Sequence, residues 1–150
     1  MKPEDFEILK KVSEKEIRFA NDLESAMKVS ANIPNLYMRY LDIYTIEFRD
    51  LNKLRAKMEK RFGELMEKYK IDSDVAWKNE SEIKSQINRD DNYYNMKIEY
   101  AQQEYIVKYL EELLGNINRM GYSINAFISL KKLLMGIPWL YYIGMTKLVF

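Results

Sequence analysis

Apolar residues recur every seven positions between residues 35 and 70. One series comprises Tyr37, Tyr44, Leu51, Met58 and Leu65, and a second comprises Leu41, Phe48 and Phe62. The pattern is broken at Arg55, with Leu54 beside it, and the segment contains no proline and one glycine, Gly63. A heptad pattern of this length predicts one helix over residues 35–70, about 50 Å long.

A second apolar pattern with steps of three and four predicts another long helix over residues 92–120. Its members are Tyr94, Ile98, Ala101, Tyr105, Tyr109, Leu113 and Ile117. Gly121 is expected to end this helix as a C-cap. A shorter helix is then predicted over residues 122–135, and Gly136 and Pro138 are expected to stop it.

Short helices are predicted before and between the two long ones. Pro3, followed by acidic residues, is typical of a helix start, and a helix through Leu9 and Val12 is expected. Asn21-Asp22-Leu23-Glu24 resembles a capping box for a helix that Ile33-Pro34 interrupts after about Val29.

Between the long helices, Asp72, Ser73 and Asp74 are expected to end the first one. Ser81-Glu82-Ile83-Lys84 opens a further short helix, which the polar residues 88–91 interrupt.

The helices define an all-α fold class, with a long-helix hairpin or coiled-coil-like architecture and short flanking helices. Five glycines and three prolines in 150 residues are too few for an all-β domain rich in turns. We expect a single helical domain, 1–150, with N-terminal helices over 1–70, C-terminal helices over 80–136 and an apolar tail over 137–150. A globular domain of this size is only about 30 Å across. The apolar faces therefore predict either self-association, which we favour, or an elongated hairpin.

Catalytic and metal sites are not predicted. The chain has no cysteine and no histidine, which excludes thiol nucleophiles, imidazole bases and the common zinc ligand sets. The five glycines form no phosphate-binding loop. Acidic pairs at Asp72/Asp74 and Asp90/Asp91 are read as turn and cap residues rather than as a magnesium site or an acid–base pair. We therefore expect a non-enzymatic protein without a cofactor.

A basic run on the first long helix is the one candidate binding site. Its members are Arg49, Lys53, Arg55, Lys57, Lys60 and Arg61. Against these six cations stand only Asp50 and Glu59, which leaves a local charge of +4 in a chain whose net charge is +1. Within the run, one helix face is expected to carry Arg49, Lys53, Lys57 and Lys60 or Arg61, because these residues recur at intervals of three to four. Such a face could follow a phosphate backbone and bind it in a salt-sensitive way. The alternative is a solvated flank whose charges pair along the helix.

Several segments, taken in order, resemble the UvsY recombination mediators of T-even-like bacteriophages. They are Glu4-Asp5-Phe6, Ser81-Glu82-Ile83-Lys84, Arg89-Asp90, the run from Ile117 to Ile124, and the run from Lys131 to Gly136. The resemblance extends nearly to Gly136. Met120 and Leu133 depart from it, because the family tends to have arginine and phenylalanine at these places.

The resemblance implies a ring-like homo-oligomer, a hexamer or heptamer, that binds single-stranded DNA. It implies that the protein helps to load a RecA-like phage recombinase onto strands covered by single-strand-binding protein, in homologous recombination and repair. It places the DNA contact on a Lys-x-Arg-type element, to which Lys60-Arg61 with Lys53 and Lys57 is the nearest match. It also implies C-terminal oligomerisation, for which the candidates are Phe127, Leu130, Leu134, Trp139 and Tyr142. The alternative function is a structural or adaptor coiled-coil oligomer without a nucleic-acid role.

The apolar tail beyond residue 136 raises the question of membrane insertion, and the N-terminus raises that of secretion. The segment from Leu133 to Phe150 carries one charge, Lys147, but Gly136, Pro138 and Gly144 interrupt it. A membrane span needs about twenty predominantly apolar residues, so an oligomer contact or a recombinase-docking segment is favoured over membrane insertion. The charged N-terminus has no apolar run behind it, and a cytoplasmic protein of the host cell is expected.

Overall fold

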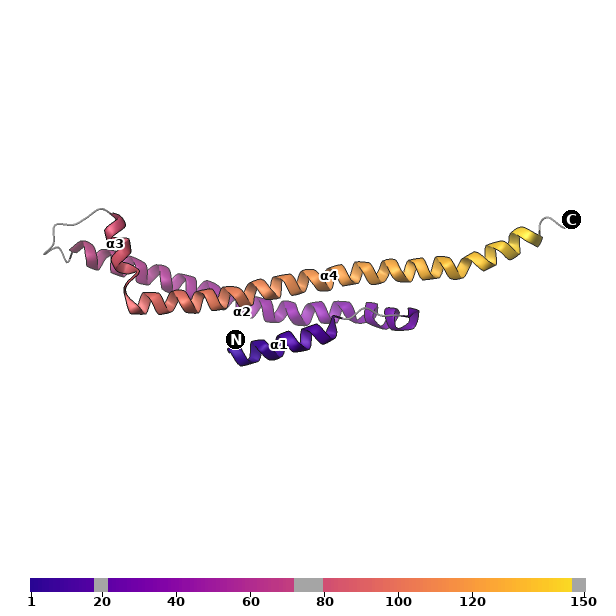
Figure 1. The fold of residues 1–150 in the computed structure, drawn as a ribbon, viewed down its shortest axis with the longest axis horizontal. Coiled ribbons are helices and arrows are strands. Elements are labelled where there is room, and N and C mark those ends of the chain that lie inside the picture. Colours follow the sequence, from indigo (N-terminus) through magenta and orange to yellow (C-terminus); the bar gives the residue numbers. More distant parts are fainter. Residues whose placement is uncertain (18–21, 72–79, 147–150) are drawn as a thin grey trace. The chain divides into compact units, whose positions relative to one another are not determined.

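The computed structural model of the chain describes residues 1–17, 22–71 and 80–146, with side chains described up to residue 136. This part of the chain is helical and contains no strand. The helices are α1 (Pro3–Glu16), α2 (Leu23–Ile71), α3 (Glu80–Ile87) and α4 (Asp91–Thr146) (Figure 1). The predicted all-α class is confirmed.

The starts of α1 and α2 follow local sequence signals. Pro3 occupies the first turn of α1, with Glu4 and Asp5 beside it, as predicted. At the start of α2 the capping side chain is that of Asp22, whose Oδ1 accepts a hydrogen bond from the Ser25 backbone N–H at 2.8 Å. The cap therefore runs from Asp22 to Ser25, whereas the predicted capping box ran from Asn21 to Glu24.

Pro34 does not interrupt α2, so the predicted break is wrong. Proline lacks an N–H and normally disrupts a helix interior at a cost of about 3 kcal/mol. Here the helix is held by packing on both sides of the proline, because Ala26, Leu36 and Tyr40 are all buried. Burial of these side chains offsets the one missing backbone hydrogen bond.

Gly121, Gly136 and Pro138 do not end α4, so these predicted boundaries are also wrong. The helix predicted over 122–135 is the continuation of α4. Gly121 is packed inside the helix: a Cβ added there would lie 3.5 Å from Ile33 of α2, an ordinary van der Waals contact, so the position neither ends the helix nor requires glycine for space. The short helix α3 and the turn after it at Asn88–Arg89 are confirmed.

The chain divides into two compact units, and both draw on α2 and α4. Unit 1 contains Met1 and Asp42–Glu111, and unit 2 contains Lys2–Leu41 and Glu112–Phe150. Each unit combines segments that are far apart in sequence. The single domain with a sequential division, expected from the sequence, stays a prediction.

In unit 1, α2 and α4 run antiparallel and α3 covers one end of their contact (Figure 1). The buried cluster there comprises Leu65, Ile83, Ile87 and Tyr93, with Met58, Phe62, Met66 and Tyr69 packed against it. Three members of the predicted heptad series, Met58, Phe62 and Leu65, therefore belong to the core of the chain itself.

In unit 2, α1 packs on α2 through Glu16, which accepts hydrogen bonds from Arg39 and from the Tyr40 hydroxyl, the latter at 2.7 Å. The Ser30 hydroxyl on α2 donates to Asn125 Oδ1 on α4 at 2.8 Å. Burial raises the pKa of Tyr40 to about 12, and its hydrogen bond to the Glu16 carboxylate adds to the shift.

Candidate nucleic-acid interface

Four cations of α2 share one exposed side of the helix. Arg49, Lys53, Lys57 and Lys60 are spaced by four, four and three residues, so their side chains project in similar directions. The side chains of Arg49, Lys53 and Lys60 are between 61% and 80% exposed, and Lys57 is also exposed. We call these four residues the basic face; all of them lie in unit 1.

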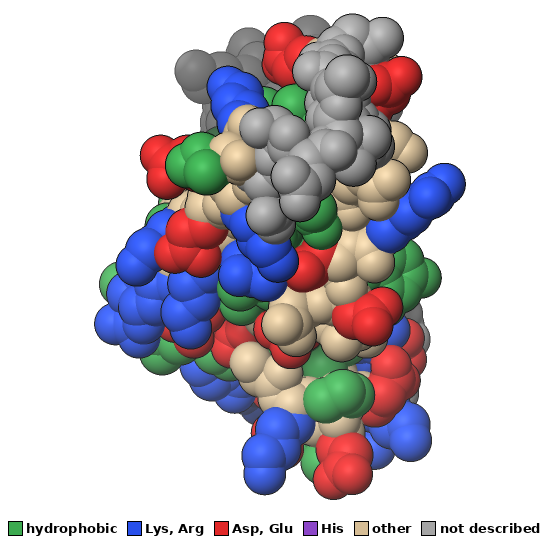
Figure 2. Space-filling view, turned by 90° about the vertical axis from the view of Figure 1, so that its left-hand side faces the viewer, with side chains coloured by type: hydrophobic (Ala, Val, Ile, Leu, Met, Phe, Trp, Pro, Cys, Tyr) green, Lys and Arg blue, Asp and Glu red, His purple; other side chains and the backbone are tan. Residues whose placement is uncertain are grey.

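Acidic side chains accompany the basic face without neutralising it. Asp50 Oδ1 lies 3.0 Å from Lys53 Nζ and 3.8 Å from Arg49 Nε, and Lys60 lies 4.0 Å from Glu64. Among the described residues, Lys57 makes no ion pair or hydrogen bond. Figure 2 likewise shows Lys and Arg side chains gathered on one side of the view, with acidic side chains between them. Exposed pairs of this kind are weak and exchange readily with other anions.

The pKa of Asp50 reflects this arrangement. The hydrogen bond from Lys53 lowers the pKa of the Asp50 carboxyl, and the charges of Lys53 and Arg49 lower it further. Asp50 is therefore an anion near neutral pH and pairs with both Lys53 and Arg49.

The other two members of the basic run, Arg55 and Arg61, make contacts within unit 1. Arg55 donates a hydrogen bond to the Tyr100 hydroxyl at 2.9 Å, and this bond raises the pKa of Arg55. Arg61 lies 3.2 Å from Asp90, and its side chain is 31% exposed. These arginines connect α2 to α4 and to the turn before it, so the structure does not place all six predicted residues on one face.

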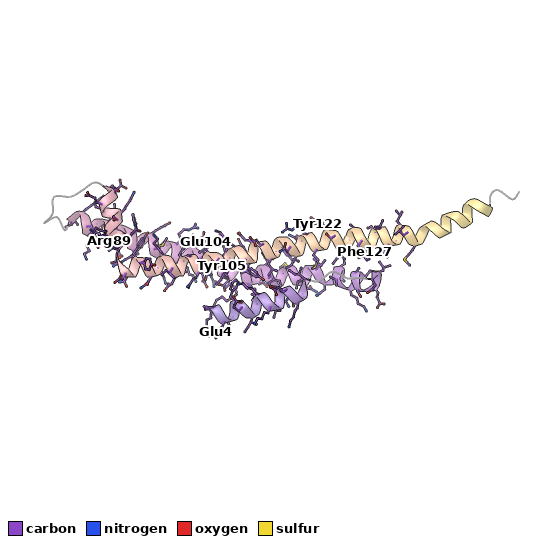
Figure 3. All side chains as sticks on the ribbon, viewed as in Figure 1. Glu4, Arg89, Glu104, Tyr105, Tyr122 and Phe127 are labelled. Carbon is purple, nitrogen blue, oxygen red and sulfur yellow. The ribbon has the colours of Figure 1, made fainter. Side chains whose placement is uncertain are left out.

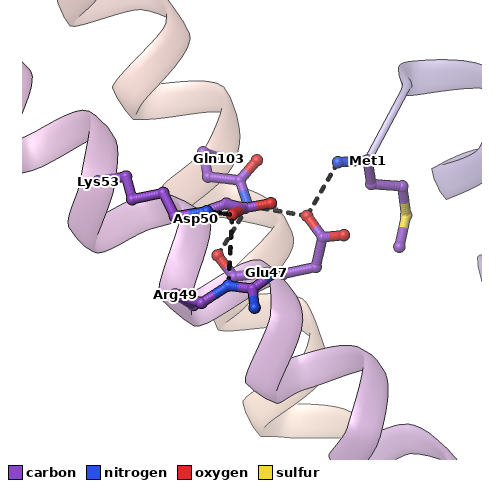
Figure 4. A network of polar contacts seen from close by, with 6 residues as sticks. All are labelled: Met1, Glu47, Arg49, Asp50, Lys53 and Gln103. Carbon is purple, nitrogen blue, oxygen red and sulfur yellow. Dashed lines mark hydrogen bonds and ion pairs between the residues drawn. The ribbon is translucent and has the colours of Figure 1, made fainter.

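A buried polar contact lies beneath the basic face (Figure 4). The side chain of Glu47 is only 7% exposed, and its Oε2 accepts hydrogen bonds from Gln103 Nε2 at 2.8 Å and from the Met1 amino group at 3.0 Å. Gln103 also donates to the Glu47 carbonyl oxygen at 2.9 Å. A satisfied buried carboxylate fixes the register of α2 against α4 directly below Arg49 and Asp50. No local sequence pattern predicts this contact, because Glu47 and Gln103 are 56 residues apart.

The candidate oligomer residues lie in unit 2 on α4. Leu130 and Leu134 are exposed, and Phe127, labelled in Figure 3, is half-buried. Leu133 and Met135 beside them are also exposed. The predicted interface residues Trp139 and Tyr142 lie outside the side chains that the structure describes. The exposed apolar set is available for a subunit contact, and its role stays a prediction.

The acidic pairs and the membrane question can be examined only over the described residues. Asp90 caps α4 through a hydrogen bond from the Tyr93 backbone N–H at 2.8 Å, in accord with a cap, whereas Asp72 and Asp74 lie outside the described residues. No group of three or more acidic residues that could hold a metal occurs within residues 1–17, 22–71 and 80–146. Over the same ranges, no helix is apolar enough over a sufficient length to cross a membrane.

The fold and the site define an all-α protein in which long antiparallel helices present an exposed cationic helix face. Comparison with known families then identifies the kind of protein. A family model described as the recombination, repair and single-stranded-DNA-binding protein UvsY matches residues 14–137, and the chain belongs to this family. The predicted family is confirmed.

A solved structure supports the fold. The chain is similar to the crystal structure of the recombination mediator protein UvsY of bacteriophage T4, with a TM-score of 0.72 and 16% sequence identity. The similarity covers 89% of this chain and 98% of the T4 chain. At this identity the likeness establishes the fold alone. A search of curated proteins found no match.

Proposed function

We propose that this protein is a recombination mediator that binds single-stranded DNA through the basic face of α2. The observation that carries the proposal is the set of four exposed cations at helical spacing, of which Lys57 has no ionic partner among the described residues. Each cation that meets a phosphate releases a condensed counterion, so binding depends strongly on salt. Membership of a recombination, repair and single-strand-binding family supports the same proposal.

The proposed mechanism requires many copies of the basic face. A single helix face with four cations gives a weak site, whereas a ring-like homo-oligomer presents repeated faces to one strand and gains affinity through avidity. A flexible single strand can follow such a surface, while bending a duplex of 20–30 base pairs costs about 1–6 kcal/mol. Holding the strand in this way would loosen its single-strand-binding protein and favour entry of a RecA-like recombinase.

The subunit contact that builds such a ring is proposed to involve the exposed apolar residues near the end of α4. Phe127, Leu130 and Leu134 are the candidates with described side chains. Trp139 and Tyr142 remain candidates from the sequence. Arg55 and Arg61 stay candidate DNA contacts only if they exchange Tyr100 and Asp90 for phosphate, so we expect them to contribute less than the basic face.

The test is a double variant of the basic face with a matched control. Lys57→Ala/Lys60→Ala removes two exposed cations from the face, and Lys28→Ala/Lys84→Ala removes two exposed cations elsewhere on helices. Fluorescence anisotropy with a labelled single strand is measured over a range of salt concentrations. We expect the first variant to bind more weakly, with a salt slope lower by about 0.7 for each lost phosphate contact.

The control variant should bind like the unmodified protein. Equal binding by both variants would remove the basic face from the site. Failure of the unmodified protein to bind at low salt would instead favour a structural or adaptor oligomer without a nucleic-acid role.

A further inference from the structure

The side of α4 that faces away from α2 in unit 1 carries an apolar row. Tyr94, Ile98 and Tyr105 are 57%, 41% and 57% exposed, and Ala101 between them is also exposed. We call these four residues the outer face of α4; Tyr105 is labelled in Figure 3. Their spacing of four, three and four residues is that of a coiled-coil contact. Tyr93, Ile106 and Val107, which are buried, occupy the opposite side of the helix.

The sequence of this face is symmetric about its midpoint. Tyr94 and Tyr105 lie at equal distances from the point between Glu99 and Tyr100, and so do Ile98 and Ala101. The next positions of the same row carry opposite charges: Asp91 stands three residues before Tyr94, and Lys108 stands three residues after Tyr105. A face with this arrangement is complementary to itself when one copy is turned end for end.

We propose that the outer face of α4 binds the same face of a second copy of this chain in antiparallel orientation, around a two-fold axis between Ile98 and Ala101. In this arrangement Asp91 lies opposite Lys108 of the second copy at both ends of the contact. The large Tyr94 meets Tyr105, and the smaller pair of Ile98 and Ala101 lies at the centre. A parallel pairing would place Asp91 against Asp91 and Lys108 against Lys108, which like-charge repulsion disfavours.

The flanking charges support the same orientation. Lys97 and Glu104 lie seven residues apart and flank the apolar row on the same side. When two copies of α4 pack antiparallel, these flanking sides of the two copies meet. Lys97 then faces Glu104 of the second copy. Such an isologous contact differs from the contact that closes a ring, because ring closure joins two different patches. The inference goes beyond the proposed DNA binding and does not depend on it.

A charge exchange tests the orientation. Asp91→Lys alone and Lys108→Asp alone each place like charges at both ends of the contact, whereas the double variant Asp91→Lys/Lys108→Asp restores opposite charges. By sedimentation velocity over a range of protein concentrations, we expect each single variant to halve the mass of the largest species. The double variant should recover that mass, although its lysine at the first residue of α4 is unfavourable for the helix dipole. Single variants of unchanged mass, or a double variant that stays at half mass, would overturn the proposal.

Cysteine cross-linking tests the register without relying on charge. The chain has no cysteine, so introduced thiols are the only ones present. Tyr94→Cys/Tyr105→Cys should form a disulfide-linked dimer and no larger species on a non-reducing gel. Either single variant should not cross-link, because its two thiols lie about 16 Å apart along the helix axis, and a disulfide needs Cα atoms within about 7 Å. A ladder of larger species, or equally strong cross-linking of the single variants, would refute the two-fold arrangement.

Discussion

The basic face of α2 and the outer face of α4 belong to the same unit and to the same helix pair, yet they differ in chemistry. Both lie opposite the side of their helix that forms the shared core. The basic face exposes four cations with acidic residues at its edges, and the outer face of α4 exposes two tyrosines, an isoleucine and an alanine. Each helix thus packs one side in the core and exposes a surface of different chemistry on the other.

This separation has a physical consequence. Attraction between the basic face and a polyanion falls as salt rises, because bound counterions are no longer released favourably. Association through apolar side chains is not weakened by salt in this way. Salts that are excluded from the protein surface, such as sulfate, strengthen it. Variants of one face should therefore leave the other contact intact, and the next predictions test whether the core, the polar contacts and the two faces can be altered independently.

The largest expected effect is on the free energy of unfolding. The same substitution, isoleucine to alanine, is compared in the core and on the outer face of α4. Ile87 is fully buried in the cluster with Leu65 and Ile83, and Ile98 is 41% exposed. We expect Ile87→Ala to lower the free energy of unfolding by about 2–5 kcal/mol, since it leaves a cavity. Ile98→Ala should lower it by less than about 1 kcal/mol while weakening self-association. Urea unfolding at low protein concentration measures both, and equal losses would mean that Ile98 is part of the core.

A medium effect is expected for the hydrogen bond between Tyr40 and Glu16 in unit 2. Tyr40→Phe keeps the buried ring and removes a bond to a carboxylate, so we expect a loss of about 1–2 kcal/mol at neutral pH. The pKa of Tyr40 is raised to about 12, above its ordinary value of 10. Its stabilising contribution is therefore complete below pH 10 and is lost as pH rises through 12, because the unfolded chain releases the phenolic proton first.

The difference in stability between the unmodified protein and Tyr40→Phe should accordingly shrink between pH 10 and pH 12. Chemical unfolding at several pH values measures it. Tyr122→Phe, which alters an exposed ring, is the matched control and should change stability by less than about 0.5 kcal/mol. A constant difference across this pH range would mean that the Tyr40 proton is not held by Glu16.

Local sequence signals predicted where helices form. Contacts between distant segments decided where the helices continue without a break. The helical periodicity of residues 35–70, the short helix α3 and the turn after it were predicted correctly, because spacing and capping act within a few residues. Continuity through Pro34 and Gly121 was not predicted, because it depends on contacts between distant segments: Leu36 and Tyr40 are buried, and Gly121 lies against Ile33.

The spacing of the basic run left Lys60 and Arg61 as alternatives on the shared face, and the structure separates these two residues. Arg55 and Arg61 contact Tyr100 and Asp90, which lie 45 and 29 residues away in sequence, and no local pattern reports such distances. For Arg55 a signal did exist: it stands outside the three- and four-residue spacing that joins Arg49, Lys53 and Lys57. That spacing already left Arg55 outside the shared face.

The smallest expected effect concerns Asp50, the counterion within the basic face. A phosphate that binds Lys53 and Arg49 must displace the Asp50 carboxylate, which lies 3.0 Å from Lys53 Nζ. Asp50→Asn keeps the side-chain shape and removes the charge, so we expect affinity for single-stranded DNA to rise about two- to fivefold, the scale of one exposed ion pair. Glu24→Gln removes a similar exposed carboxylate, paired with Lys28 in unit 2, and serves as the control for net charge. If anisotropy titrations show the same gain for both variants, the effect belongs to the charge of the whole molecule. A gain confined to Asp50→Asn means that the basic face is restrained by its own acidic residue and that its affinity is set at this one position.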